Sequence, residues 1–123
     1  MHDEAIILFA HGARDPEWAA PFHLIREQVR AGRPGIAVEL AFLEFMSPPL
    51  GGTVAQLIAS GAKRITLVPL FMAQGGHLKH DLPRMVERIR AEHPGVTLKV
   101  APAVGDVPDI LAAISAWVVR ESL

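Results

Sequence analysis

The sequence predicts an α/β protein in which a four-stranded parallel sheet is covered by helices on both faces. Short apolar runs alternate with longer segments whose apolar residues recur at helical spacing, and this alternation is typical of repeated βα units. Short turns rich in glycine and proline separate the segments. Because crossovers between parallel strands are right-handed in nearly all cases, we expect a flavodoxin-like three-layer sandwich with strand order 2-1-3-4. The length of 123 residues predicts a single domain, residues 1–123.

The first βα unit begins with an apolar strand at residues 5–10, AIILFA. Continuous apolar character is expected where both faces of a strand are covered. Asp15 and Pro16 then supply an N-cap and a first helical position, and the helix runs to about residue 31. One apolar side of this helix is expected from four residues at spacings of three and four: Trp18, Phe22, Ile25 and Val29.

The second unit begins with a strand at residues 36–43, in which the apolar residues at every second position lie on the same face. Ser47, followed by Pro48 and Pro49, is expected to open a helix that ends at residues 60–61. The third strand, residues 64–69, should finish at its proline, which cannot donate a ladder hydrogen bond.

The loop after the third strand carries Gly75 and Gly76, which should set His77 at a loop tip. Asp81 is then expected as an N-cap, with Pro83 in the first turn of a helix over residues 84–92. The last unit consists of a strand at 96–101 and a helix from residue 108 to about 120.

The composition excludes several classes of protein. A net charge of −1 provides no broad basic surface for nucleic acid. The absence of cysteine excludes disulfides and thiolate metal sites, and it fits a cytoplasmic protein. The first residues lack the pattern of a signal peptide, and no apolar run approaches the roughly 20 residues of a membrane span. We therefore expect a cytoplasmic protein with neither nucleic acid nor membrane as a partner.

Three side chains of metal-binding type follow three strands: His11 after the first, Glu44 after the second and His77 after the third. Carboxyl ends of parallel strands meet at one edge of the sheet, where ligands bind in open α/β folds. Two imidazoles and a carboxylate suit Fe²⁺, Co²⁺, Ni²⁺ or Zn²⁺ and leave coordination positions open. Each residue has an ordinary alternative, since His11 could be a hydrogen-bonding residue and Glu44 a solvated one. Their joint arrangement favours an exchangeable metal.

At these positions the sequence resembles the class II tetrapyrrole chelatases, and above all the short CbiX/SirB type. The resemblance covers nearly the whole chain. It rests on three motifs: FAHGAR at residues 9–14, AFLEFMSP at 41–48 and PLFMAQGGHLKHDLP at 69–83. The third motif is the most specific. Ala13 stands where many members carry serine, so a hydroxyl contact there is lost.

The resemblance implies ATP-independent insertion of Co²⁺ or Fe²⁺ into sirohydrochlorin, on the route to cobalamin, siroheme or related tetrapyrroles. It assigns the metal to His11 and His77, with Glu44 assisting. The divalent metal, Co²⁺, Fe²⁺ or Ni²⁺, would be a substrate, and no nucleotide cofactor is implied. Because the family also has a long form with two fused copies, one copy implies a homodimer whose crevices form a shared cavity.

The residue types agree with metal insertion, because the macrocycle must lose two N–H protons while the metal sheds its ligands. A neutral imidazole can ligate metal or accept a proton, and Glu44 could move protons away. Apolar contact with the macrocycle is expected from Leu70, Phe71 and Met72, although core packing explains them equally well. The carboxylates of sirohydrochlorin have three candidate partners: Arg14, Lys79 and Arg84.

Other functions compete with this interpretation. A non-catalytic metal or tetrapyrrole carrier could use the same histidines. An FMN module would need a Ser/Thr-rich phosphate loop after the first strand, which residues 11–16 lack. A phosphoryl-transfer enzyme with an Arg-His-Gly motif is disfavoured because Ala10 occupies the arginine position. An α/β-hydrolase is disfavoured because no Gly-x-Ser-x-Gly elbow occurs.

Overall fold

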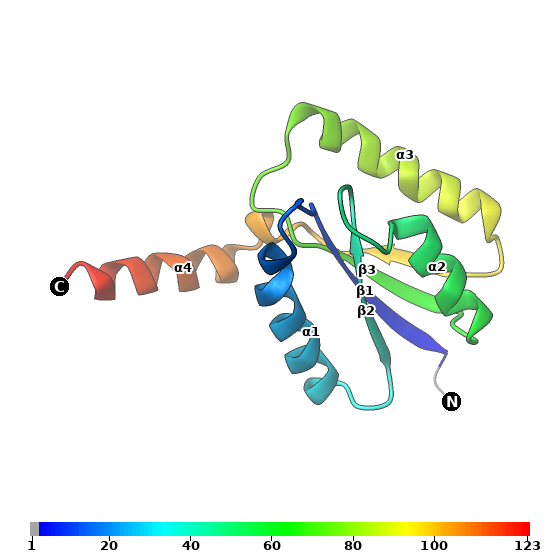
Figure 1. The fold of residues 1–123 in the computed structure, drawn as a ribbon, viewed down its shortest axis with the longest axis horizontal. Helices are drawn as coiled ribbons and strands as arrows, with labels where there is room; N and C mark the ends of the chain where they lie inside the picture. Colours follow the sequence, from blue (N-terminus) through cyan, green and yellow to red (C-terminus); the bar gives the residue numbers. More distant parts are fainter. Residues whose placement is uncertain (1–2) are drawn as a thin grey trace.

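The computed structural model describes residues 3–123, apart from the side chain of His77. Its centre is a parallel sheet with the strand order β2-β1-β3-β4, which confirms the predicted topology (Figure 1). The strands are β1 (Glu4–Ala10), β2 (Ala37–Phe42), β3 (Arg64–Pro69) and β4 (Thr97–Val100). Their carboxyl ends lie at one edge of the sheet, as parallel pairing requires.

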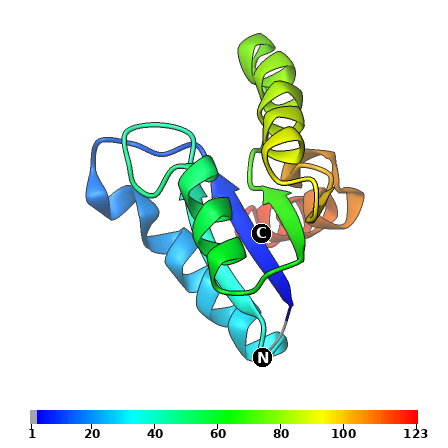
Figure 2. The same ribbon diagram turned by 90° about the vertical axis from the view of Figure 1, so that its right-hand side faces the viewer.

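Helices follow each strand. They are η1 (Pro16–Ala19), α1 (Ala20–Gly32), α2 (Leu50–Ala59), α3 (Gly76–Glu92), η2 (Val104–Asp106) and α4 (Pro108–Glu121), where η marks a 3₁₀ turn. Helix α1 lies on one face of the sheet, and α2 and α3 lie on the other (Figures 1 and 2). Helix α4 extends away from the sheet (Figure 1). Of the helices in residues 3–123, none is both long and apolar enough to cross a membrane.

The alternating residues of the strands build one core on each face. Ile7, Phe9, Ile65 and Leu67 pack beneath α2 and α3, and each is at most 1% exposed. On the opposite face, a second set packs with α1 and η1: Leu8, Val38, Leu40, Phe42, Trp18, Phe22 and Val29. Side chains that alternate across a strand explain this division.

The start of the first helix agrees with prediction, since the carboxylate of Asp15 accepts a hydrogen bond of 3.0 Å from the backbone N–H of Glu17. The first turn is a 3₁₀ turn, so the α-helix begins only at Ala20. Ile25, expected on the apolar side, is 37% exposed, whereas the other three residues of that side are partly buried.

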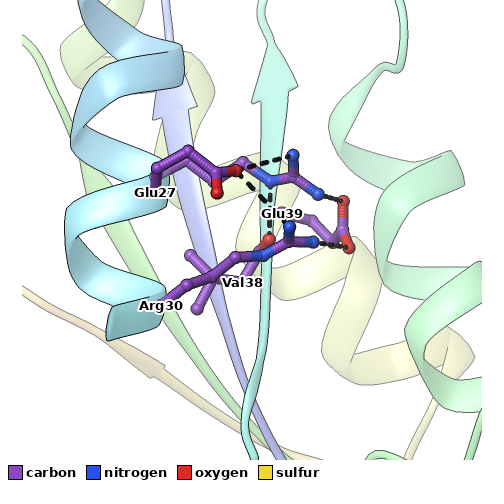
Figure 3. Close-up of polar contacts among 5 residues, drawn as sticks. Glu27, Arg30, Val38 and Glu39 are labelled. Atoms are coloured by element: carbon purple, nitrogen blue, oxygen red, sulfur yellow. Dashed lines mark hydrogen bonds and ion pairs between the residues drawn. The ribbon is translucent and has the colours of Figure 1, made fainter. Parts of the chain in front are cut away.

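Helix α1 is tied to the edge strand β2 by a charged network (Figure 3). Arg26 donates from Nε to the carbonyl oxygen of Val38 at 2.8 Å and from Nη2 to Glu39 at 3.0 Å. Arg30 approaches the same carboxylate at 3.8 Å, and Glu27 lies 3.4 Å from Arg30. This network fixes which flank of α1 faces the β2 edge.

Two predicted helix starts are wrong. Helix α2 begins at Leu50 after Pro49, with no side-chain cap, so Ser47 does not cap it. Helix α3 begins at Gly76, five residues before the expected N-cap Asp81, and Pro83 lies inside it. His77 is therefore in the first helical turn rather than at a loop tip.

The early start of α3 has a physical reason. A proline inside a helix removes one backbone hydrogen bond and costs about 3 kcal/mol. Leu78 and Leu82, which precede Pro83, are nevertheless buried on the same side of α3 as Val86 and Ile89. Burying each such side chain contributes about 1.5–3 kcal/mol, so Leu78 and Leu82 together offset the cost of the proline.

Candidate active site

The ends of β1 and β2 bring His11 and Glu44 together. Backbone hydrogen bonds continue past the strands, from the N–H of Leu43 to Ala10 at 2.9 Å and from the N–H of Glu44 to His11 at 3.1 Å. The side chains then meet, with Nε2 of His11 2.9 Å from Oε1 of Glu44. Both are about half exposed, at 52% and 48%. The pair is therefore held by the sheet yet open to a ligand.

Gly12 allows the two loops to approach this closely. It has a φ of +93°, in the left-handed region that favours glycine. A Cβ at this position would overlap the carbonyl oxygen of Glu44. The glycine of the FAHGAR motif thus sets the position of both candidate side chains.

A pocket of about 480 Å³ opens beside the pair. Its volume lies within the range of small-molecule sites, about 300–1,000 Å³. Three segments line it, from the ends of β1 and β2 and from the start of α3: His11, Leu43, Glu44, Ala73, Gly75, Gly76, Leu78 and Asp81. The backbone of residue 77 lies between two lining residues, whereas the predicted metal-binding side chain of His77 lies outside the described part of the structure.

Two of the predicted macrocycle contacts pack inside the protein. Phe71 is 5% exposed, and its ring stands edge-on to Phe9 with centroids 5.6 Å apart. It also stands edge-on to His11, with centroids 6.4 Å apart. Leu70 is half-buried on the α1 face. Phe71 therefore packs against the imidazole ring of His11. Met72, by contrast, is 56% exposed and open to a ligand.

Phe45 is a candidate residue that the sequence reasoning missed. It follows Glu44 directly, has a φ of 64° and is 56% exposed. The guanidinium carbon of Arg14 lies 5.0 Å from the centre of its ring, a cation–π contact. A large apolar residue in the loop after a strand, outside any helical or strand pattern, was the signal available in the sequence.

The charged residues of α3 are divided between its flanks. Asp81 lines the pocket at His11 and Glu44, and Arg84 is exposed one turn further along the helix. Lys79 instead lines a separate hollow of about 300 Å³ together with Val86 and Arg90. By its helical position Arg84 lies on the same side of α3 as Asp81, whereas Lys79 lies on the other side.

Within the described side chains, no group of three or more His, Cys, Asp or Glu could hold a metal ion. His11 and Glu44 provide two donors, an imidazole nitrogen and a carboxylate oxygen, which suit a borderline divalent metal. The predicted third ligand is His77, whose side chain the structure does not describe. The metal-binding roles of these three residues stay predictions.

Comparison with known proteins identifies the family of the chain. A family model described as CbiX matches residues 5–121. A sirohydrochlorin cobaltochelatase of Methanococcus aeolicus is 35% identical over 89 residues, which cover 72% of this chain and 62% of that relative. One of Saccharolobus islandicus is 38% identical over 81 residues, 66% of this chain and 62% of the relative.

Solved structures agree. The CbiX protein from Marinobacter aquaeolei is 36% identical, with a TM-score of 0.83 and 96% of each chain covered. SirB from Bacillus subtilis, in a structure with Fe³⁺, is 24% identical with a TM-score of 0.77. The similarity to SirB covers 94% of this chain and 46% of SirB, and at this identity it shows the fold alone. The family match over residues 5–121 is what decides the assignment: the chain belongs to the CbiX family.

Proposed function

We propose that the protein inserts a divalent metal ion into sirohydrochlorin without ATP. Membership of the CbiX family and the names of the relatives support this proposal. The observation that carries it is the His11–Glu44 pair, 2.9 Å apart beside an open pocket. A metal-type donor and a proton-accepting group stand together at the edge of the sheet where α/β folds bind ligands.

The spacing of the pair fits a single metal ion. Metal–nitrogen and metal–oxygen bonds are about 2.0–2.2 Å, so two ligands at a right angle lie about 3 Å apart. The separation of 2.9 Å between His11 Nε2 and Glu44 Oε1 matches this value. Both atoms could therefore contact one ion without movement of the backbone. In a second arrangement, His11 alone would hold the metal through Nε2, and the carboxylate of Glu44 would stay free to accept a proton.

We assign Glu44 mainly to proton transfer. Metallation removes two N–H protons from the macrocycle, and a histidine that holds metal cannot accept them. A carboxylate 2.9 Å from the metal-binding nitrogen is within reach of both the metal and the macrocycle above it. His77 would supply a further ligand from the first turn of α3.

The macrocycle would lie over the pocket mouth. Phe45 and Met72, each 56% exposed, offer apolar contact to its face. Arg14, which lies over the ring of Phe45, and the exposed Arg84 would bind its carboxylates. Phe71 and Leu70 act by packing beneath the loop rather than by contact, and Lys79 receives no contact in this arrangement.

We further propose a homodimer, because a flat macrocycle needs a second wall that one crevice does not supply. Co²⁺, Fe²⁺ and Ni²⁺ are all candidate substrates, with sirohydrochlorin as the tetrapyrrole. A cytoplasmic location remains a prediction.

The test compares three metals with sirohydrochlorin and follows metallation by absorbance. Catalytic amounts of protein are incubated with sirohydrochlorin and Co²⁺, Fe²⁺ or Ni²⁺ in the absence of ATP. Repeated turnover with at least one metal supports the proposal. Stoichiometric binding without accumulation of product would instead indicate a carrier that uses the same residues.

A further inference from the structure

The sheet has two edge strands, β2 and β4, because the strand order is β2-β1-β3-β4. The outward backbone groups of an edge strand can pair with an extended chain, which is a route to aggregation. At each edge, an arginine of the preceding helix donates to one of these backbone groups. Arg26 of α1 donates from Nε to the carbonyl oxygen of Val38 in β2 at 2.8 Å. Arg90 of α3 donates from Nη2 to the carbonyl oxygen of Leu98 in β4 at 2.7 Å.

In β2, the backbone groups of every second residue point away from the sheet, because the N–H of Leu43 just beyond the strand bonds inward to β1. The outward residues are Val38, Leu40 and Phe42. The N–H of Phe42 bonds to the carbonyl oxygen of Pro48 in the following loop at 2.9 Å, and Arg26 bonds to Val38. These two contacts leave a single outward residue of β2 between them.

The same arrangement holds in β4. The N–H groups of Thr97 and Ala101 bond inward to the β3 side, both at 2.9 Å, so Leu98 and Val100 point outward. Arg90 covers the first of the two. An added strand pairs through successive outward residues of the edge. With one of them covered, each edge offers an added strand a single point of attachment.

The two edge strands belong to a repeat within the chain. Residues 27–41, EQVRAGRPGIAVELA, resemble residues 87–101, ERIRAEHPGVTLKVA. The two helices also end in the same conformation, with φ and ψ of −133° and 66° at Arg33 and of −132° and 65° at His93. Val38 is equivalent to Leu98 in this alignment. The same carbonyl oxygen is therefore covered in both copies of the repeat.

The two arginines, however, are not equivalent. Arg90 corresponds to Arg30, whereas Arg26 lies one helical turn earlier. The residue after the covered carbonyl explains the difference, because Glu39 lies 3.8 Å from Arg30 and draws it to the carboxylate (Figure 3). Lys99, in the equivalent place, has the same charge as Arg90 and cannot do so. One carbonyl is thus covered by two arginines of different origin, which favours a role for the contact itself over a by-product of the repeat.

We propose that Arg26 and Arg90 close the two edges of the sheet against pairing with an extended chain, in particular with the edge strand of a second copy. The hydrogen bond occupies one of two successive outward residues on each strand. The guanidinium group also places a positive charge at the edge, and charged side chains there disfavour strand addition. The proposal concerns the strand edges alone and does not depend on the proposed chelatase activity.

Replacement of each arginine by methionine tests the proposal. Methionine keeps an unbranched apolar stem but removes the donor and the charge. Arg26→Met and Arg90→Met should form species larger than the wild type as protein concentration rises, measured by light scattering together with thioflavin T fluorescence. The wild type should form no such species over the same range of concentration, because both of its edges are covered.

Each helix offers a matched control. Arg30→Met removes the ion pairs of that arginine on α1 but leaves the carbonyl of Val38 covered. Arg88→Met removes an exposed arginine of α3 two residues from Arg90. Both controls should keep the wild-type mass. Equal growth in the controls, or wild-type mass in a folded Arg26→Met or Arg90→Met protein, overturns the proposal for that edge.

Hydrogen exchange locates the new contact. The amide of Leu40 in Arg26→Met, and that of Val100 in Arg90→Met, should become protected as protein concentration rises, because pairing at the edge occupies them. Protection confined to other segments would show that the larger species form elsewhere, which contradicts the proposal. The wild type needs no substitution and should exchange both amides at rates independent of concentration. Protection of either amide that increases with wild-type concentration would show that its edges are open.

Discussion

The carbonyl oxygen of Glu44 occupies the space that a Cβ at position 12 would need, so only glycine fits between His11 and the β2 loop. The φ of +93° at Gly12 adds a second reason for glycine. The close approach of Gly12 to the backbone of Glu44 thereby fixes the positions of the His11 and Glu44 side chains.

Gly12→Ala should accordingly damage stability and activity together. Left-handed strain and the overlap with Glu44 should lower the free energy of unfolding by about 1–3 kcal/mol, measured by chemical denaturation. The rate of metallation should fall because His11 and Glu44 separate. Gly51→Ala is the control: it lies in α2 with open space around it, and it should be neutral or stabilising by up to about 1 kcal/mol. Wild-type stability and rate in Gly12→Ala would contradict the structural role.

Glu44→Gln separates proton transfer from metal binding. If the carboxylate moves protons, metal affinity should be largely kept while single-turnover metallation slows by about 10²–10⁴-fold. Metal titration and rapid-mixing absorbance are run on the same preparation. Glu87→Gln, at a 74% exposed side chain on α3, serves as the control and should change neither. A parallel fall in affinity and rate would make Glu44 a metal ligand, and wild-type values for both would remove it from the mechanism.

Cobalt binding should depend on His11 and on pH. Imidazole must be neutral to ligate, so Co²⁺ affinity should decrease as the solution becomes acidic. The His11→Ala/His77→Ala double variant should lose most binding, as followed by the visible absorbance of Co²⁺. His93→Ala, at the end of α3 beyond Glu92, should bind as wild type. Unchanged binding in the double variant would place the metal elsewhere.

Phe45→Ala should weaken binding of the macrocycle more than catalysis. Loss of the cation–π contact removes the support of Arg14, worth about 0.5–1 kcal/mol at an exposed site, or about 2- to 5-fold in KM. The kcat should change little, because neither residue contacts the metal. Leu123→Ala, at an exposed apolar residue beyond the end of α4, provides the comparison. A large loss of kcat with constant KM would contradict this division.

The parts predicted correctly from the sequence are those in which local pattern and tertiary packing agree. Strand β3 was predicted at its observed bounds because its apolar pattern and Pro69 both indicate that the strand ends at the same residue. The start of α3 was missed because rules for proline describe local preference, whereas the burial of Leu78 and Leu82 extends the helix to the residues before Pro83. The prediction for α4 gave its residues but not its position, because the sequence indicates where a helix lies along the chain without indicating which surface it packs on.

The candidate site also has a part that the sequence predicted and a part that it did not. Parallel strands bring their ends together by topology, so the approach of His11 and Glu44 followed from their places after β1 and β2. Phe45 was missed because its exposure depends on a loop with a positive φ, which no sequence period reveals.

The central claim is that the His11–Glu44 pair catalyses metal insertion. The most direct measurement counts metallated tetrapyrroles formed per protein chain from Co²⁺ and sirohydrochlorin without ATP, for the wild type and for His11→Ala. The account predicts many turnovers by the wild type and a rate close to the protein-free background for a folded His11→Ala variant. Equal turnover by the two proteins, or no turnover by the wild type with any divalent metal, would contradict it.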